Sequence, residues 1–202
     1  MTIQYMDKAE DACEQRAYAK AGQQYTFAAY EALLKCDYPE PEMISTGANL
    51  GRTFYYFENA AFTFRLAGNP ARAANRVEQA ILIVEDFDEY YFHPDVLHGL
   101  AQECLADLEL IRGNEDVAMT HYDRAAELYE PVTDTAWMAE TIFEYAFEFF
   151  RGVMHAAGSP VSVEEQLSML DSFEKRVTAK RERLPRAIET VVTTGEYQPS
   201  KY

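Results

Sequence analysis

Three glutamates and a histidine share one stripe of a predicted helix and could bind a metal ion. In the segment MAETIFEYAFEFFRGVMH, Glu140, Glu144 and Glu148 recur every four residues, and His155 follows seven residues after the last. Carboxylate and imidazole groups on one helix face can ligate a divalent cation. However, the paired Glu-x-x-His motifs of di-iron bundles are absent, and no other helix offers a matching histidine. We therefore favour a solvated acidic face, and predict no metal and no cofactor.

Nucleophilic catalysis has little support in the sequence. The other histidines are scattered and lack metalloprotease spacing: His93, His98 and His121. The cysteines form no Cys-x-x-Cys pair and are interpreted as reduced, buried side chains: Cys13, Cys36 and Cys104. No Gly-x-Ser-x-Gly motif, phosphate loop or dinucleotide fingerprint occurs. A pairing of Cys104 with a histidine stays open, but the sequence favours a protein that is not an enzyme.

A basic cluster near the C-terminus stands out in an acidic chain. Six of the 18 Lys and Arg residues fall within twelve positions: Lys175, Arg176, Lys180, Arg181, Arg183 and Arg186. Arg176, Lys180 and Arg183 share one face of a predicted helix. Three uses are open: ion pairs with Glu174 and Glu182, docking onto an acidic surface of this or another copy of the chain, and contact with nucleic acid.

The elements that position these groups are indicated by regularly spaced glycines. Gly22, Gly68, Gly113 and Gly158 are 46, 45 and 45 residues apart, and each separates two stretches with helical apolar spacing. Glycine readily takes the left-handed conformation that ends a helix. The pattern therefore predicts four helical hairpins, each turning at one of these glycines.

The two middle hairpins resemble each other and a known family. They read GNPARAANRVEQA from Gly68 and GNEDVAMTHYDRA from Gly113, with alanines five and twelve residues after each glycine. Ahead of Gly68, an aromatic and small-residue face spaced at i, i+3, i+4 and i+7 comprises Phe57, Ala60, Ala61 and Phe64. Residues 55–85 and 100–131 thus resemble tetratricopeptide repeats, although the period of about 45 exceeds that family's ~34 residues.

The resemblance implies an all-α fold, a right-handed superhelical array of about four helix-turn-helix hairpins. We predict helices at residues 6–21, 24–36, 44–67, 70–87, 94–112, 115–129, 134–157 and 162–183. Residues 1–184 would form a single helical repeat domain. Residues 185–202 would hold a short helix at 185–193 and a loose tail.

In the tetratricopeptide family, the first helices of the hairpins line a concave groove that binds peptides or partner helices. Carried onto this chain, the groove comprises Arg16, Tyr55, Glu58, Phe62, Arg65, Glu103, Asp107, Tyr145, Glu148 and His155. This acidic and aromatic surface would suit a basic or aromatic peptide. Alternatively, these side chains pack against neighbouring helices or face water. The resemblance therefore implies a non-catalytic interaction or scaffold module.

The aromatic segment TFYYFENAAFTFR, from Thr53 to Arg65, divides between two helix faces. At 100° per residue, Phe57 and Phe64 fall on the predicted packing face. Tyr55 and Phe62 fall on a second face, where they contact either a neighbouring helix or a partner.

Composition limits the partners and the location. The chain has 34 acids, 18 bases and a net charge of −16, which disfavours nucleic acid and anionic lipid along its main body. Only six bases are lysine, a composition that resembles the cytosolic proteins of salt-loving archaea; a mesophilic protein with basic partners is the alternative. The longest stretch without charged residues, 152–163, is too short to span a membrane, and no secretory leader is visible. We expect a cytoplasmic protein.

Two alternative functions stay open beside the interaction module. One is a helical enzyme or metal-binding protein of unknown reaction, and the other is a regulator that contacts nucleic acid through the basic helix. The basic helix could also join two copies of the chain as a homodimer.

Overall fold

The structure is a computed structural model that describes residues 2–36, 43–87, 94–131, 143–170 and 172–199. Within these ranges the regular structure is entirely helical, which confirms the all-α prediction. The helices are α1 (Thr2–Glu14), α2 (Tyr18–Leu33), α3 (Met43–Leu66), α4 (Pro70–Phe87), α5 (Pro94–Arg112), α6 (Glu115–Tyr129), α7 (Phe143–Ala156), α8 (Val163–Leu170) and α9 (Phe173–Thr194). Each of these helices is too short or too polar to cross a lipid bilayer.

Three of the predicted turn glycines do end helices. Gly68, Gly113 and Gly158 have φ angles of 70°, 94° and 74°, in the left-handed region that glycine adopts at little steric cost. After α3, for example, the Asn69 N–H donates to the Phe64 carbonyl at 2.9 Å, which closes the helix end. These glycines therefore separate α3 from α4, α5 from α6, and α7 from α8.

The predicted turn at Gly22 is wrong. The first hairpin turns at Arg16. Among the described residues other than glycine, Arg16 is the one with a positive φ, at 53°. Gly22 lies inside α2 and is buried, and a Cβ atom there would lie 3.0 Å from the Phe64 ring. Glycine is needed here because α2 approaches α3 closely. The helices expected at 6–21 and 24–36 are therefore α1 and α2, which begin several residues earlier.

The C-terminal region also differs from the prediction. The helix expected at 162–183 is divided into α8 and α9, and α9 begins after the N-cap Ser172, whose hydroxyl accepts the Lys175 N–H. The break expected at Pro185 is absent, because α9 continues through this proline to Thr194. Packing along α9 outweighs the hydrogen bond that proline cannot donate.

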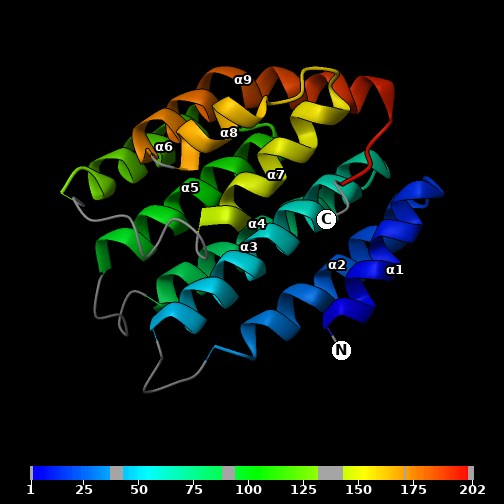
Figure 1. The fold of residues 1–202 in the computed structure, drawn as a ribbon. Helices are drawn as coiled ribbons and strands as arrows, with labels where there is room; N and C mark the ends of the chain where they lie inside the picture. Colours follow the sequence, from blue (N-terminus) through cyan, green and yellow to red (C-terminus); the bar gives the residue numbers. More distant parts are fainter. Residues whose placement is uncertain (1, 37–42, 88–93, 132–142, 171, 200–202) are drawn as a thin grey trace.

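Helix α3 lies at the centre of the molecule. From Asn49 to Phe64 every residue except Arg52 is buried, and α3 packs against α2, α4, α5 and α7. A helix that is buried on all sides forms the middle of a core rather than one of its surfaces. Figure 1 shows α9 along the upper edge of the bundle, beside α6, α7 and α8, with α1 and α2 on the opposite side.

The C-terminal tail is not loose over its described part. After α9 the chain turns back towards the middle of the bundle (Figure 1), and Tyr197 is 1% exposed. Its hydroxyl donates to the Asn59 side-chain oxygen at 2.6 Å, and its backbone N–H donates to the Tyr18 hydroxyl at 3.0 Å. The expectation of a loose tail is therefore wrong for residues 195–199, because a buried aromatic ring anchors them to α2 and α3. Residues 200–202 lie outside the described ranges.

Candidate functional site beneath the C-terminal helix

Two cations on α9 face two carboxylates on α5, and all four side chains are fully buried. The Arg176 guanidinium donates to both oxygens of Glu103, at 2.8 Å from Nε and 2.6 Å from Nη2. Lys180 Nζ lies 3.0 Å from Glu103 Oε1 and 2.5 Å from Asp107 Oδ2. On each helix the two charged residues are four positions apart and share a face. We call these four residues the charge cluster.

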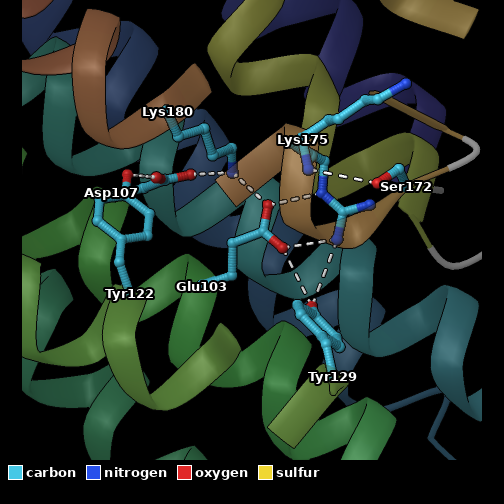
Figure 2. Close-up of polar contacts among 8 residues, drawn as sticks. Glu103, Asp107, Tyr122, Tyr129, Ser172, Lys175 and Lys180 are labelled. Atoms are coloured by element: carbon cyan, nitrogen blue, oxygen red, sulfur yellow. Dashed lines mark hydrogen bonds and ion pairs between the residues drawn. The ribbon is translucent and has the colours of Figure 1, made fainter. Parts of the chain in front are cut away.

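Two tyrosines of α6 also hydrogen-bond to the charge cluster. Figure 2 shows Tyr129 directed at Glu103 and Tyr122 directed at Asp107. The Tyr129 hydroxyl donates to Glu103 Oε2 at 3.0 Å, and the Tyr122 hydroxyl donates to Asp107 Oδ1. Each carboxylate therefore accepts hydrogen bonds from a cation and from a phenol. Burying charged groups is tolerable only with this degree of pairing.

The Tyr129 ring is held by the residues around it. It stacks on Phe173 of α9 with ring centroids 4.4 Å apart, and the Arg176 guanidinium lies 5.7 Å from its centroid. Gly99 of α5 also lies against this ring, and a Cβ atom there would come within 2.4 Å of it. The absence of a side chain at Gly99 is thus what allows α6 to bring Tyr129 to Glu103.

The two carboxylates of the charge cluster differ in their electrostatics. Burial alone would raise the pKa of Glu103, but Arg176 and Lys180 outweigh burial and lower it to about 2. Burial raises the pKa of Asp107 to about 6, with Lys180 opposing the rise and Glu103 adding to it. The pKa of Lys180 is raised above its ordinary value, because the attraction of Asp107 and Glu103 outweighs burial. Glu103 is therefore firmly ionised at neutral pH.

A third carboxyl group, Glu58 of α3, lies beside the charge cluster without a cation of its own. Burial, together with the nearby Asp107, raises the pKa of Glu58 well above its ordinary value. The Cys104 thiol is the neighbouring group that can donate a hydrogen bond to it. The raised pKa favours the protonated, uncharged form of Glu58.

The groups near the charge cluster that could do chemistry are a buried thiol and carboxylates. Burial raises the pKa of the Cys104 thiol well above its ordinary value, so this thiol is a poor nucleophile. Among the residues that the structure describes, no group of three His, Cys, Asp or Glu side chains is arranged to hold a metal ion. The charge cluster fastens α9 to α5 through buried ion pairs, and the two tyrosines link α6 to it through hydrogen bonds.

The predicted groove is covered by other helices. Six of its ten residues are buried: Tyr55, Glu58, Phe62, Glu103, Asp107 and Glu148. The structure does bring Glu58, Glu103 and Asp107 together, but it brings them together under α9. An open groove lined by these residues is therefore wrong for this conformation, because α7 and α9 pack against the surface that would form it.

The two rings left open by the aromatic segment contact neighbouring elements of the same chain. Tyr55 lies 6.4 Å from Tyr145 of α7, measured between ring centroids. Phe62 makes edge contacts with Phe149 of α7 and Tyr197 of the tail, at 5.7 and 4.9 Å. Packing against neighbouring helices, the alternative to the groove, is what the structure shows for both rings.

The remaining groove residues are dispersed. Arg65 is half-buried and donates to the Leu110 and Ile111 carbonyls at the end of α5. Arg16 is exposed and forms an ion pair with Glu196 at 2.5 Å. Tyr145 accepts a hydrogen bond from Arg52 at 2.7 Å, and His155 is exposed at the end of α7.

The glutamate stripe considered as a metal site is described only in part. Glu148 is buried and forms an ion pair with Arg151 at 2.9 Å, whereas His155 is exposed. Glu140 and the side chain of Glu144 lie outside the described residues. The described members therefore do not face a common site.

Sequence reasoning missed the partners of the acidic residues. The sequence predicts a basic face with Arg176 and Lys180, and of its three open uses the structure shows docking onto an acidic surface of the same chain. The available signal was the matched spacing, because Glu103 and Asp107 are four residues apart, as are Arg176 and Lys180. The roles of Tyr122 and Tyr129 carry no comparable signal.

Comparison of the chain with protein-family models, with curated proteins and with solved structures finds no match. Its function is accordingly inferred from its own residues and their arrangement.

Proposed function

We propose that the protein is a non-catalytic interaction module, a right-handed array of tetratricopeptide-like hairpins that binds a partner helix on the outer face of α2. The observation that carries this proposal is a row of exposed apolar side chains on α2 and its C-cap residue. Phe27, Tyr30 and Leu34 are 45%, 37% and 85% exposed, at positions i, i+3 and i+7. Large apolar residues at this spacing on an exposed helix face are typical of surfaces that bind another helix. We call them the α2 stripe.

The rings of the α2 stripe are held in place by their neighbours. Phe27 contacts Tyr5 of α1 with ring centroids 5.5 Å apart, and Tyr30 meets the buried ring of Phe57 edge-on at 5.6 Å. Side chains that are already ordered lose less conformational entropy when a partner binds. The α2 stripe is thus suited to binding as it stands.

The inner face is less suited to an outside partner. α9 lies where the family resemblance implies a ligand, and its Arg176 and Lys180 already neutralise Glu103 and Asp107. Displacing α9 would remove the counter-ions of Glu103 and Asp107, and a buried charge left without its partner costs about 3–5 kcal/mol. An external basic peptide or the α9 of a second copy would have to compensate for that loss.

The two other functions find less support. For an enzyme, the nucleophile considered, Cys104, is fully buried with a raised pKa. For nucleic-acid binding, Arg176 and Lys180 are buried, while Arg181 and Arg183 pair with Asp123 and Glu165. Much of the positive charge on α9 is thus paired with acidic residues of the same chain.

Site-specific photo-crosslinking tests the proposed function. A photoreactive phenylalanine analogue would replace Tyr30, and the full-length protein would be irradiated in a native lysate of its source. A matched control would carry the analogue at Val117 of α6, which is also apolar and 44% exposed. We expect a discrete adduct from position 30 that is weakened by Leu34→Ser. The same adducts from both positions, or none from position 30, would remove the α2 stripe as the binding surface.

A further inference from the structure

We infer that the partner of the α2 stripe is an acidic amphipathic helix. This inference rests on the proposed function and adds the charge of the partner to it. It follows from two arginines of α4, Arg72 and Arg76, that border the α2 stripe and have no acidic partner in the described chain.

Both arginines lie on α4, and the first turn of α4 shares a packing partner with α2. The Tyr30 hydroxyl acts electrostatically on Arg76 and opposes the lowering of the Arg76 pKa. The Arg72 guanidinium lies 5.5 Å from the centroid of the Phe64 ring, and Gly22 of α2 packs against the same ring. The two arginines are one turn apart on α4, so they form one positive edge.

This positive edge is not neutralised by the described residues. The side-chain contacts of Arg76 there are a hydrogen bond to the Asn75 side chain at 2.6 Å and the electrostatic influence of Tyr30 and Arg72. Arg76 Nε, like Oε1 of Gln79 three residues later, is buried and has no hydrogen-bond partner within the part of the chain that the structure describes. Arg72 makes a cation–π contact with Phe64 but no ion pair with a described acid.

The absence of pairing is informative because acids are abundant. The chain has 34 acids and 18 bases, and arginines on other helices, such as Arg112, Arg181 and Arg183, each pair with a nearby carboxylate. Burial and the repulsion of Arg72 both lower the pKa of Arg76, which indicates that the two positive charges are not compensated locally. A carboxylate of a partner would relieve this repulsion and satisfy Arg76.

The chemistry of the fitting partner follows. It presents apolar side chains at i, i+3 and i+7 to Phe27, Tyr30 and Leu34, and Asp or Glu on the flank that faces α4. Lys20 lies seven residues before Phe27 on the same side of α2 and is exposed, so positive charge continues beyond the apolar part. A basic helix would meet repulsion at each of these points, even though the chain as a whole is acidic.

Two helical peptides test the inference on the full-length protein. Both would be 18 residues long and fluorescently labelled, with the same leucine stripe and with either Glu or Lys on the flanks. Binding would be measured by fluorescence anisotropy at 0.15 M salt, where charges more than about 8 Å apart are largely screened. We expect the Glu peptide to bind about tenfold more tightly than the Lys peptide.

Charge reversal supplies the matched controls. Arg72→Glu with Arg76→Glu should reverse the preference between the two peptides. Arg124→Glu with Arg186→Glu, at exposed positions of α6 and α9, changes the net charge equally and should leave the preference intact. Phe27→Ser with Leu34→Ser should abolish binding of either peptide.

Three outcomes would overturn the inference. Equal binding of the two peptides, lost in the Phe27→Ser and Leu34→Ser variant, would keep the α2 stripe as a binding face and reject the acidic partner. Binding of neither peptide would reject the acidic helix, while the photo-crosslinking experiment would still decide the proposed function. Light scattering that shows a dimer dissociated by Leu34→Glu would identify a second copy of the chain as the occupant instead.

Discussion

Arg176 of α9 and Glu103 of α5 form a bidentate ion pair in which both side chains are fully buried. The pair joins residues 73 positions apart and, with Lys180 and Asp107, fixes the register of the last long helix against the bundle. Such a pair does not guarantee net stability, because desolvation opposes the attraction between the charges. Its effect is greatest when one partner is removed and the other stays buried.

Replacing Glu103 by Gln should destabilise the protein strongly. The substitution keeps the shape of the side chain but leaves the Arg176 charge buried without its counter-ion. We expect the free energy of unfolding to fall by about 3–5 kcal/mol, measured by urea denaturation. Glu127→Gln provides the control, because Glu127 pairs with Arg124 on the exposed surface of α6 and should cost less than about 1 kcal/mol. Equal losses in the two variants would contradict the role of the charge cluster.

Stability should depend on pH through Glu103. Its folded-state pKa is lowered to about 2 from an ordinary value of 4.5. For a carboxyl group with a lowered pKa, the stabilisation is present above the unfolded-state value and is lost as the pH falls towards the folded-state value. We expect unfolding to become easier as the pH falls from 4.5 towards 2, followed by circular dichroism. Glu103→Gln should remove this contribution from the pH profile, and an unchanged acid limb would count against it.

Glu58 should behave in the opposite way to Glu103. Because its folded-state pKa is raised, its contribution to stability is present below its unfolded-state pKa and is lost as the pH rises through the folded-state pKa. Glu58→Gln resembles the protonated acid and should change the free energy of unfolding by less than about 1.5 kcal/mol at neutral pH. The variant should also lose the destabilisation of the wild type at higher pH, as measured by urea denaturation at several pH values. A loss as large as that of Glu103→Gln would show that Glu58 is ionised.

Much of the helical pattern could be predicted from local signals. The bounds of α4, α5 and α6 coincide with the predicted ranges 70–87, 94–112 and 115–129. At these ends Gly, Pro or Asn interrupts a clear apolar period, so local chemistry and tertiary structure agree. At Gly22 and Pro185 they disagree. Gly22 is explained by contact with Phe64, and α9 continues through Pro185 while its buried face packs along the bundle.

The sequence predicts the two charged surfaces of the candidate site but not the contact between them. It predicts one surface with the acidic residues Glu58, Glu103 and Asp107, and another with Arg176 and Lys180. The sequence does not show that these two surfaces contact each other. The contact joins residues more than seventy positions apart, and it depends on how α7 and α9 pack over α3 and α5. The family resemblance suggested an open groove, since it describes the hairpins and not the helix that follows them.

Gly99→Ala should destabilise the protein although alanine favours helices. A Cβ atom at position 99 would lie 2.4 Å from the Tyr129 ring and would push it from Phe173 and Glu103. We expect a net loss of about 1–3 kcal/mol in the free energy of unfolding, since overpacking outweighs the gain in helix propensity of about 1 kcal/mol. Gly22→Ala should cost less, because its Cβ would lie 3.0 Å from Phe64. Thermal stability that rises in Gly99→Ala would show that Tyr129 can move without loss.

The described part of the tail should contribute to stability through Tyr197. Its hydroxyl is buried and donates to Asn59, which also holds the Tyr55 carbonyl through its amide group at 2.8 Å. Tyr197→Phe leaves the Asn59 oxygen without its donor in a buried site, so we expect a loss of about 1–3 kcal/mol in the free energy of unfolding. Removing residues 195–202 should cost more, because the ring that packs on Phe62 is lost as well. Removing residues 200–202 alone is the matched control and should keep Tyr197 in place. If both truncated proteins and the full chain unfolded at the same urea concentration, the tail would make no contribution to the free energy of unfolding.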